Sequence, residues 1–415
     1  MHAWLPYYAG FSEDFVASLL DEFKVGDTAI VFDPMNGSGT TTLVAQQTGY
    51  CCIGADLNPA AAAIARAKNA ALVGRALAEI AKETADAARR ISRLAEMSPD
   101  ADAWFHSETF TDVRRLQSAI QRTSAEPLAP IAPRLLATLN DSAPCVASIR
   151  AFLTAALIVA ARRASRARPS KNPTWLKRST ISEKEPANLL AGFVAAAAEM
   201  EADLVAAFGP DKSPVDRALV LDADARALPL KSASIDLIVT SPPYLTRIDY
   251  AVTTAVELAT LGVESASDQD RLRREIMGST CITGGRYEMR KDWGPTCRKV
   301  LELIRRHPSK ASSGYYFKNH VQYFRDAAAI LREYLRVLKR GAPAALVVQD
   351  SWYKDIHVPL GTIYVEMARA LGASTSEIVR SDHVRSHLGL VNTRARKYSK
   401  GELFEHVVLI RGRKT

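Results

Sequence analysis

The sequence lacks an apolar segment long enough to cross a membrane. Among its 415 residues, the segment that comes closest covers residues 151–161 and is followed by Arg162 and Arg163. A membrane-spanning helix needs about 20 apolar residues. The N-terminus also lacks a basic segment followed by an apolar one, the pattern of a secretory signal. These absences predict a cytoplasmic protein with no membrane partner.

Cysteine is scarce and its spacing is irregular. The five cysteines are Cys51, Cys52, Cys145, Cys281 and Cys297. Their spacing fits no disulfide framework, and no cluster of cysteine and histidine has the spacing of zinc ligands. The sequence therefore predicts reduced thiols and no bound metal. For the adjacent cysteines at 51 and 52, small side chains packed in a buried strand are the simplest interpretation.

The bulk composition is that of a folded protein with an excess of basic residues. Hydrophobic residues make up 47% of the chain and charged residues 24%, which excludes global disorder. A chain of this length can bury an α/β core and carry an additional module. The net charge of +9 and the pI near 9.3 are compatible with a polyanionic partner. They are equally compatible with the absence of one, since many basic proteins have no such partner.

A glycine-rich turn lies between a predicted strand and a predicted helix near the N-terminus. An amphipathic helix at Glu13–Phe23 is followed by a strand at 28–32, and the turn then covers residues 33–41. A helix through 43–47 leads to a second strand at 50–55, directly before Asp56. The order of strand, glycine-rich turn, helix, strand and acid is typical of a nucleotide-binding α/β unit.

Alanine-rich helical patterns fill the middle of the chain, at residues 59–97, 111–122, 147–163 and 185–208. Alanine favours helix but adds little apolar bulk, so these helices should pack closely on one another. Further strands are predicted at 218–221, 234–240, 344–349 and 406–410, and further helices at 250–261, 321–338 and 362–371.

Three acids follow predicted strands. Asp33 begins the glycine-rich turn, Asp56 closes the next strand, and Asp224 follows the strand at 218–221. An acid in the position of Asp56 can accept hydrogen bonds from both hydroxyls of a ribose. Each feature by itself is more often an ordinary turn or a surface acid. Because ligands of such folds bind outside the carboxyl ends of the strands, together they predict one cofactor site.

A fourth strand end carries Ser241, Pro242, Pro243 and Tyr244. The two prolines remove backbone donors and restrain the chain, which would leave carbonyls pointing into a cleft. An aromatic ring beside them could stack on a planar base while Ser241 and the Pro242 carbonyl hold its amino group. For two prolines in isolation, a rigid exit from a strand is the simpler interpretation.

The residues of both sites resemble known motifs. The turn at 33–41, with the sequence DPMNGSGTT, resembles the S-adenosylmethionine (SAM)-binding motif of the DNA amino-methyltransferases. The sequence SPPY at 241–244 resembles their catalytic motif. Residues 2–12 are similar to the segment that closes over the methionine part of SAM, and residues 247–250 and 334–339 extend the match. The resemblance spans nearly the whole chain, most loosely in the helical region, and the pairing of the two motifs is highly specific.

The resemblance implies an α/β, Rossmann-like SAM methyltransferase fold, with a mostly parallel sheet, one antiparallel strand near the C-terminus and a helical insertion. Residues 1–70 and 215–415 would form the catalytic core, and residues 71–214 the insertion. Residues 265–320 are a candidate DNA-recognition segment within the core. The cofactor motif precedes the catalytic motif, the reverse of the order in many relatives, but this permutation leaves the site intact. The insertion is longer than is usual in the family.

The family chemistry is direct transfer of the sulfonium methyl of SAM to a base amino group, with the base flipped out of the duplex and no metal. Ser241 favours cytosine N4 as the target, since Asp in its place would favour adenine N6. An RNA methyltransferase and a catalytically silent DNA-binding subunit remain alternatives. Residues expected to bind SAM are Phe11, Ser12, Asp33, Pro34, Asn36, Gly37, Ser38, Gly39, Thr40, Thr41, Asp56, Asn58 and Asp224.

Three basic segments, at 162–178, 271–310 and 380–400, have the pattern of loops. A single basic run is more often a solvated face, but three of them in a methyltransferase-like chain favour contacts with phosphates of double-stranded DNA. No nuclease-type cluster is present, so a restriction endonuclease partner would be a separate chain. Residues expected to contact DNA are Arg166, Arg168, Lys171, Arg247, Arg271, Arg273, Arg274, Arg394 and Arg396.

Overall fold

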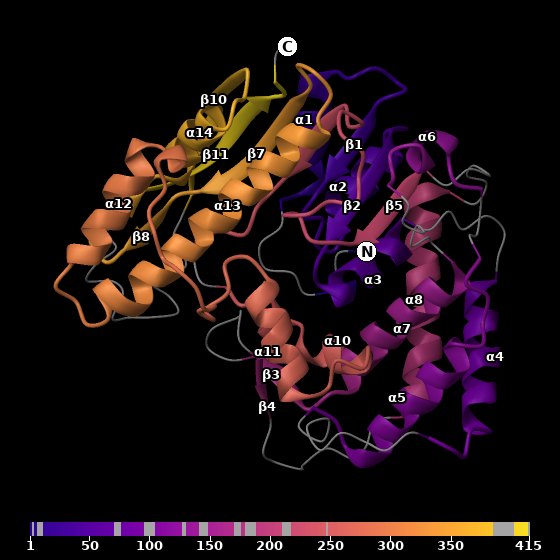
Figure 1. The fold of residues 1–415 in the computed structure, drawn as a ribbon. Helices are drawn as coiled ribbons and strands as arrows, with labels where there is room; N and C mark the ends of the chain where they lie inside the picture. The colour runs from indigo at the N-terminus through magenta and orange to yellow at the C-terminus, as the bar shows by residue number, and fades with distance from the viewer. Residues whose placement is uncertain are drawn as a thin grey trace.

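The computed structural model describes residues 1, 4–5, 11–69, 76–94, 104–126, 130–140, 148–169, 176–178, 188–209, 217–245, 248–384 and 402–413. Within this part of the chain, seven strands form one sheet in the order β10-β11-β7-β6-β1-β2-β5 (Figure 1). The strands are β1 (Ile30–Asp33), β2 (Cys51–Asp56), β5 (Ala218–Asp222), β6 (Leu237–Thr240), β7 (Pro343–Gln349), β10 (Thr375–Val384) and β11 (Leu403–Arg411).

Of these seven strands, β11 alone runs against the others. Strands β5, β2, β1, β6 and β7 pair in parallel, whereas β11 is antiparallel to both β7 and β10. The predicted α/β fold is therefore confirmed: the sheet is mostly parallel and Rossmann-like, with one antiparallel strand near the C-terminus. Sequence patterns predicted every strand of this sheet except β10.

Helices cover both faces of the sheet because successive strand residues point to opposite sides. In β1, Val31 packs with α1 (Glu13–Phe23) and α2 (Thr40–Gln47), whereas Phe32 packs in the core of the opposite face. The opposite face is covered by α12 (Pro295–Arg306), α13 (Phe317–Val337) and α14 (Leu360–Ala370). Cys51 and Cys52 are both fully buried in β2, one on each face, as predicted for a buried strand.

The alanine-rich helices form a lobe beside the sheet, at the lower right of Figure 1. It contains α4 (Leu77–Arg89), α5 (Ser107–Ile120), α7 (Ile149–Ala164) and α8 (Leu189–Phe208). Two helices from the predicted core, α3 (Pro59–Lys68) and α10 (Ala255–Thr260), share its apolar cluster. Conversely, one residue of the predicted insertion packs in the core of the sheet: Leu135 of the short helix α6 (Pro133–Leu136). Lobe and core are therefore joined through shared apolar clusters.

The prediction of a basic loop over residues 271–310 is wrong. The segment contains the second half of α11 (Ala266–Glu275), the 3-10 turn η3 (Lys291–Trp293) and α12. Helix α12 buries Cys297, Val300, Leu301 and Ile304, which recur at helical spacing between basic residues. The basic side chains lie on the opposite face of this strongly amphipathic helix, and they obscured the apolar pattern.

The loop prediction for residues 162–178 is also wrong in the described part. Helix α7 extends to Ala164, and β3 (Ala167–Pro169) then pairs antiparallel with β4 (Leu176–Arg178). In the third basic segment, residues 380–384 belong to β10, while residues 385–400 lie outside the described residues. A small hairpin of β8 (Ser351–Tyr353) and β9 (Ile356–Val358) was not predicted. No helix among the described residues has the length and apolar character to span a bilayer.

Candidate active site

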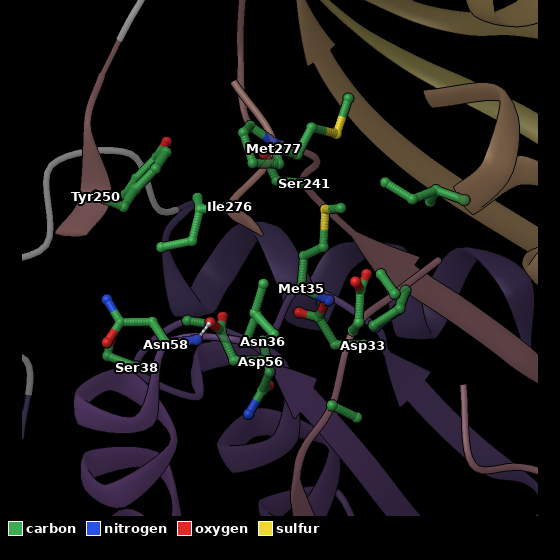
Figure 2. A pocket seen from close by; sticks show the side chains of 18 of the residues that line it. Asp33, Met35, Asn36, Ser38, Asp56, Asn58, Ser241, Tyr250, Ile276 and Met277 are labelled. Carbon is green, nitrogen blue, oxygen red and sulfur yellow. Dashed lines mark hydrogen bonds between the residues drawn. The ribbon is translucent and has the colours of Figure 1, made fainter. Parts of the chain in front are cut away.

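The carboxyl ends of four neighbouring strands meet at one pocket. Strands β6, β1, β2 and β5 are adjacent in the sheet, so the residues that follow them come together at one edge. The pocket is lined by Asp33, Asp56, Asp224 and Ser241 from these four ends. Figure 2 shows Asp33, Met35, Asn36 and Asp56 on one side of the cavity, and Ser241 with Met277 on the other. The structure therefore brings the two predicted motifs to the same cavity.

Most residues predicted to bind the cofactor line this pocket. They are Phe11, Asp33, Pro34, Asn36, Gly37, Ser38, Thr40, Thr41, Asp56, Asn58 and Asp224. Ser12 and Gly39 are outside the lining. Ser12 caps helix α1, since its hydroxyl accepts a hydrogen bond from the Phe15 amide. Gly39 precedes α2 with φ +89°, and a Cβ there would come within 2.9 Å of the Ala65 Cβ, so this position requires glycine.

Asp33 holds the cofactor turn together from inside. Its Oδ1 accepts hydrogen bonds from the Met35 amide and the Thr240 hydroxyl, at 3.0 and 2.6 Å, and its Oδ2 accepts one from the Thr41 hydroxyl at 2.6 Å. The side chain is buried, and this burial raises its pKa to about 6. Because Thr240 precedes Ser241, Asp33 also ties the cofactor turn to the strand that carries the catalytic motif.

Asp56 connects the turn to the next helix. Its Oδ2 accepts a hydrogen bond from the Gly37 amide and its Oδ1 one from the Asn58 amide, both at 2.8 Å. Burial raises its pKa to about 6. Asn58 caps α3 and donates to the Thr254 hydroxyl at 2.9 Å. Asp56 can still accept hydrogen bonds from a ligand, since each carboxylate oxygen has two lone pairs.

Asp224 is clamped by Arg226, a residue that the sequence analysis missed. The Arg226 guanidinium donates to both carboxylate oxygens of Asp224 at 2.7–3.0 Å, and also to the carbonyl of Glu275 at 2.7 Å. It lies 3.4 Å from the carboxylate of Asp326 on α13. These contacts raise the pKa of Arg226 against the opposing effect of its burial. The arginine therefore fixes Asp224 relative to two other walls of the pocket.

Hydrogen bonds to Tyr323 and Glu405 hold the SPPY segment at 241–244 in place. Ser241 and Pro243 line the pocket, and the Pro243 carbonyl accepts a hydrogen bond from the Tyr323 hydroxyl at 2.8 Å. Pro242 is buried. Tyr244 is not among the lining residues; its hydroxyl donates to Glu405 Oε2 at 2.8 Å. Burial and the charge of Glu405 raise the pKa of Tyr244 well above its usual value, so the phenol stays protonated.

A buried lysine lies behind the cofactor turn. Lys68, at the end of α3, is fully buried, and its Nζ donates to the Ser38 hydroxyl at 3.3 Å. Burial lowers its pKa to about 8, while Glu13 opposes this effect. Sequence patterns gave no signal for this residue, because a basic residue in the last turn of a helix is usually solvated.

Several pocket residues were not predicted. Ile276 and Met277 come directly after α11, in a segment interpreted as a basic loop, and Tyr250 follows the catalytic motif. Figure 2 shows Tyr250 and Ile276 above Asn58 and Asp56. For Tyr250 a signal existed, since it belongs to the matched segment at 247–250. Met35 and Leu5 also line the pocket; they belong to the predicted turn at 33–41 and to the matched segment at 2–12, without an individual prediction. The remaining unpredicted lining residues are Leu57, Ala223, Ala225, Arg226, Glu275 and Ile330.

The predicted DNA-binding arginines of α11 are engaged within the protein. Arg273 donates to the buried carboxylate of Asp249 at 2.8 Å, Arg274 pairs with Asp270 at 2.8 Å, and Arg271 pairs with Asp268 at 2.9 Å. Of these, Arg271 and Arg274 remain exposed. Arg166 is partly buried, and Arg168 is exposed on β3. Lys171, Arg247, Arg394 and Arg396 lie outside the described residues.

The pocket suits an adenosyl cofactor with a ribose. Asp56 is part of the lining and offers carboxylate acceptors for ribose hydroxyls. Asn36 packs behind the turn: its Oδ1 accepts from the Thr42 hydroxyl, and its Nδ2 is buried against Gly54 of β2. In the described part of the chain, no three His, Cys, Asp or Glu side chains are grouped to hold a metal.

The strand-end pocket on a mostly parallel sheet defines an α/β protein of the Rossmann-like class. The chain is similar to the type II methyltransferase M.BsoBI of Geobacillus stearothermophilus, with 23% identity over 416 residues, 90% of this chain and 78% of the relative. It is also similar to the type II methyltransferase M.AvaI of Nostoc sp., with 24% identity over 406 residues, 91% of this chain and 80% of the relative. This similarity along most of the chain supports a methyltransferase.

Solved structures resemble the chain less closely. The [4+2]-cyclase SpnF has a TM-score of 0.34 and 10% identity, covering 97% of this chain and 82% of its own. The rRNA methyltransferase aviRa from Streptomyces viridochromogenes has a TM-score of 0.28 and 11% identity, covering 98% of this chain and 87% of its own. Scores this low do not discriminate between activities. No family model matches the sequence.

Proposed function

We propose that the protein is a SAM-dependent DNA methyltransferase that modifies the exocyclic N4 amino group of cytosine after base flipping. The observation that carries the proposal is the meeting of two motifs at one pocket: the turn at 33–41 lines one side, and Ser241 and Pro243 line another. Similarity to two type II methyltransferases along nine-tenths of the chain supports it. The site would work in the cytoplasm, and any restriction endonuclease partner would be a separate chain.

Cofactor residues would bind and orient SAM. Asp56 would accept hydrogen bonds from the ribose hydroxyls, Asn36 would support the turn at 33–41 from behind, and Asp224 would bind at the adenine end. The segment that contains Phe11 and Ser12 would cover the methionine end. When bound, SAM supplies an electrophilic sulfonium methyl group.

The catalytic motif would hold the target base. An exocyclic amino group is a weak nucleophile because its lone pair is delocalised into the ring. Ser241 Oγ would accept a hydrogen bond from one amino hydrogen and the Pro242 carbonyl one from the other, while Tyr244 would stack on the base. These contacts localise the lone pair and align it with the methyl group, an effect of positioning and electrostatics. The target atom is inaccessible in a stacked duplex, so the base must be flipped.

Mass spectrometry of nucleosides tests the proposal directly. DNA from cells that express the protein should contain 4-methylcytosine, and DNA from cells that express Ser241→Ala should contain little or none. Detection of 6-methyladenine alone would show that the target is adenine N6, the alternative within the same class of enzyme. Methylation of RNA alone would refute the DNA substrate. Binding of SAM without any product would favour a catalytically silent DNA-binding subunit.

A further inference from the structure

A hydrogen-bonded line of three side chains leads away from the wall of the pocket. The Ser241 hydroxyl donates a hydrogen bond to the Tyr244 hydroxyl, with 3.5 Å between the two oxygens. The Tyr244 hydroxyl in turn donates to Glu405 Oε2 at 2.8 Å. We propose that this line carries a proton away from the target amino group, with Glu405 as its terminal acceptor. The inference rests on the proposed function, and it adds Glu405 to the site as a residue that acts through Tyr244.

Methyl transfer to an amino group requires the loss of one proton. As the bond between nitrogen and the methyl carbon forms and the bond between that carbon and sulfur breaks, positive charge develops on the amino nitrogen. In the same step one of its N–H bonds breaks, and the proton passes to Ser241 Oγ. The Ser241 proton passes to the Tyr244 oxygen, and the Tyr244 proton passes to Glu405. The serine and tyrosine end as they began, and Glu405 ends as a carboxylic acid.

The direction of the hydrogen bonds fits this transfer. Because the Ser241 hydroxyl points its proton at Tyr244, its lone pairs are available to accept the amino hydrogen from the base. Burial and the nearby Glu405 charge disfavour a phenolate at Tyr244, so the phenol must gain one proton as it gives up the other. Glu405 is only partly buried, which lets it return the acquired proton to water.

The reversed strand explains why Glu405 reaches the site. Strands β6 and β7 are parallel, so Ser241 and the end of β7 lie at the same edge of the sheet. Glu405 pairs with Gln349, the last residue of β7, because β11 runs antiparallel and begins where β7 ends. A parallel strand in this position would place its early residues at the opposite edge. The antiparallel direction of β11 thus places the Glu405 carboxylate next to the residues at 241–244.

Single-turnover methyl transfer provides the test. The assay uses the full-length protein, tritiated SAM and whole-genome-amplified DNA, which presents many sequences without methyl groups. We expect Glu405→Gln to slow the methyl-transfer step roughly 100-fold, the lower range for a lost proton-transfer group. Glu405→Asp should recover part of that loss because it keeps the carboxylate. The matched control is Glu377→Gln on β10, an exposed carboxylate that should react at the wild-type rate.

A double-mutant cycle separates a proton path from a local structural role. Tyr244→Phe keeps the ring but removes the hydroxyl, so it should slow transfer as much as Glu405→Gln, and the double variant should be no slower. A solvent deuterium isotope effect on the wild-type step should shrink in both single variants. The affinity for SAM, measured by calorimetry, should stay unchanged in both single variants. The double variant should lose less melting temperature than the sum of the losses in the two single variants.

The outcomes distinguish the two proposals. If Glu405→Gln transfers methyl groups at the wild-type rate, or if the effects of Glu405→Gln and Tyr244→Phe multiply, the proton path is refuted while the enzyme class stands. If the wild type labels no DNA at all, the proposed function fails and the path fails with it. If Glu405→Gln does not fold, Tyr244→Phe alone decides, because a wild-type rate in that variant refutes the path.

Discussion

At the residue scale, Asp33 and Asp56 are similar carboxylates with different tasks. Asp33 accepts hydrogen bonds from the Met35 amide and from the hydroxyls of Thr41 and Thr240, and it is only 2% exposed. Asp56 accepts one hydrogen bond at each oxygen and lies in the pocket beside Asn58. We therefore propose that Asp33 stabilises the conformation of the turn and that Asp56 contacts the cofactor directly.

Replacement of Asp56 by alanine should weaken SAM binding. The change removes a carboxylate that would accept hydrogen bonds from ribose, and it also releases the Gly37 amide. We expect a loss of about 1 to 3 kcal/mol in binding free energy, measured by calorimetry. Asp222→Ala is the matched control, because Asp222 ends the neighbouring strand but pairs with Arg66 outside the pocket lining. Equal SAM affinity in wild type and Asp56→Ala would remove Asp56 from the site.

The raised pKa of Asp33 predicts how stability depends on pH. Its pKa is about 6 in the folded protein and near 3.8 in an unperturbed chain, so the folded state binds the proton more tightly. This contribution to stability is therefore complete below pH 3.8 and is lost as pH rises through 6. The unfolding free energy of wild type minus that of Asp33→Asn should fall by about 2 kcal/mol between pH 4 and pH 7.

Denaturant titrations at several pH values measure this difference. Comparison with Asp33→Asn cancels the titration of all other groups and leaves the contribution of Asp33. A difference that stays constant from pH 4 to pH 7, or that grows with pH, would show that the carboxyl is not held in a costly buried state.

At the scale of elements, we propose two functions for α11, which the sequence merged into one basic run. Arg273 faces inward and donates to Asp249, whose side chain is 1% exposed and which caps α9 (Tyr250–Thr253). Arg271 and Arg274 face outward in exposed pairs with acids of the same helix. The helix ends at the pocket residues Ile276 and Met277, so its inner face shapes the site while its outer face is available to DNA.

Substitutions on α11 should separate these functions. Arg273→Gln leaves the Asp249 carboxylate buried without its cation, which should lower the unfolding free energy by about 3 kcal/mol. Replacing Arg271 and Arg274 together by glutamine should leave stability nearly unchanged. It should instead weaken DNA binding and flatten the salt dependence of the affinity, because fewer counterions are released.

DNA-binding titrations at several salt concentrations measure the second effect. Arg89→Gln serves as the control, since Arg89 forms the same kind of exposed pair with an acid of its own helix, but on α4 in the helical lobe. An identical salt slope in wild type and the double variant would show that these arginines are only a solvated face, and Arg166 and Arg168 would then be the next candidates.

At the scale of the whole molecule, a buried ion pair joins the helical lobe to the catalytic core. Arg162 at the end of α7 donates to both carboxylate oxygens of Glu257 on α10, at 2.9 and 3.0 Å, and Glu257 is fully buried. Helices α7 and α10 share one apolar cluster with α3, which begins just after Asp56. The position of the lobe is therefore coupled to the cofactor pocket.

Replacement of Arg162 by methionine should destabilise the protein as a whole. Glu257 would remain buried without its cation, at a cost of about 3 kcal/mol in unfolding free energy. The adjacent Arg163→Met is the matched control, because its pair with Glu199 is exposed and should contribute less than about 1 kcal/mol. Thermal unfolding should keep a single transition, since lobe and core share their apolar cluster. A separate early transition in Arg162→Met would show that the lobe unfolds independently.

The sequence by itself determined the features that local patterns encode. Strands β1, β2, β5, β6, β7 and β11, the helix α1 and the alanine-rich helices follow from periodicity and propensity. The meeting of Asp33, Asp56, Asp224 and Ser241 also followed, because each lies at the end of a parallel strand or within two residues of it, and such ends share an edge of the sheet.

Only the tertiary structure decided which side chains face each other across long separations. Tyr244 and Glu405 are 161 residues apart, and Arg162 and Glu257 are 95 apart, so no local pattern could pair them. The same reason applies to Ile276 and Met277, which belong to the pocket only because α11 ends there. The role of a basic residue is ambiguous in the sequence. A guanidinium can be solvated at the surface, contact a phosphate or pair with a buried acid, and its neighbours in space determine which of these it does.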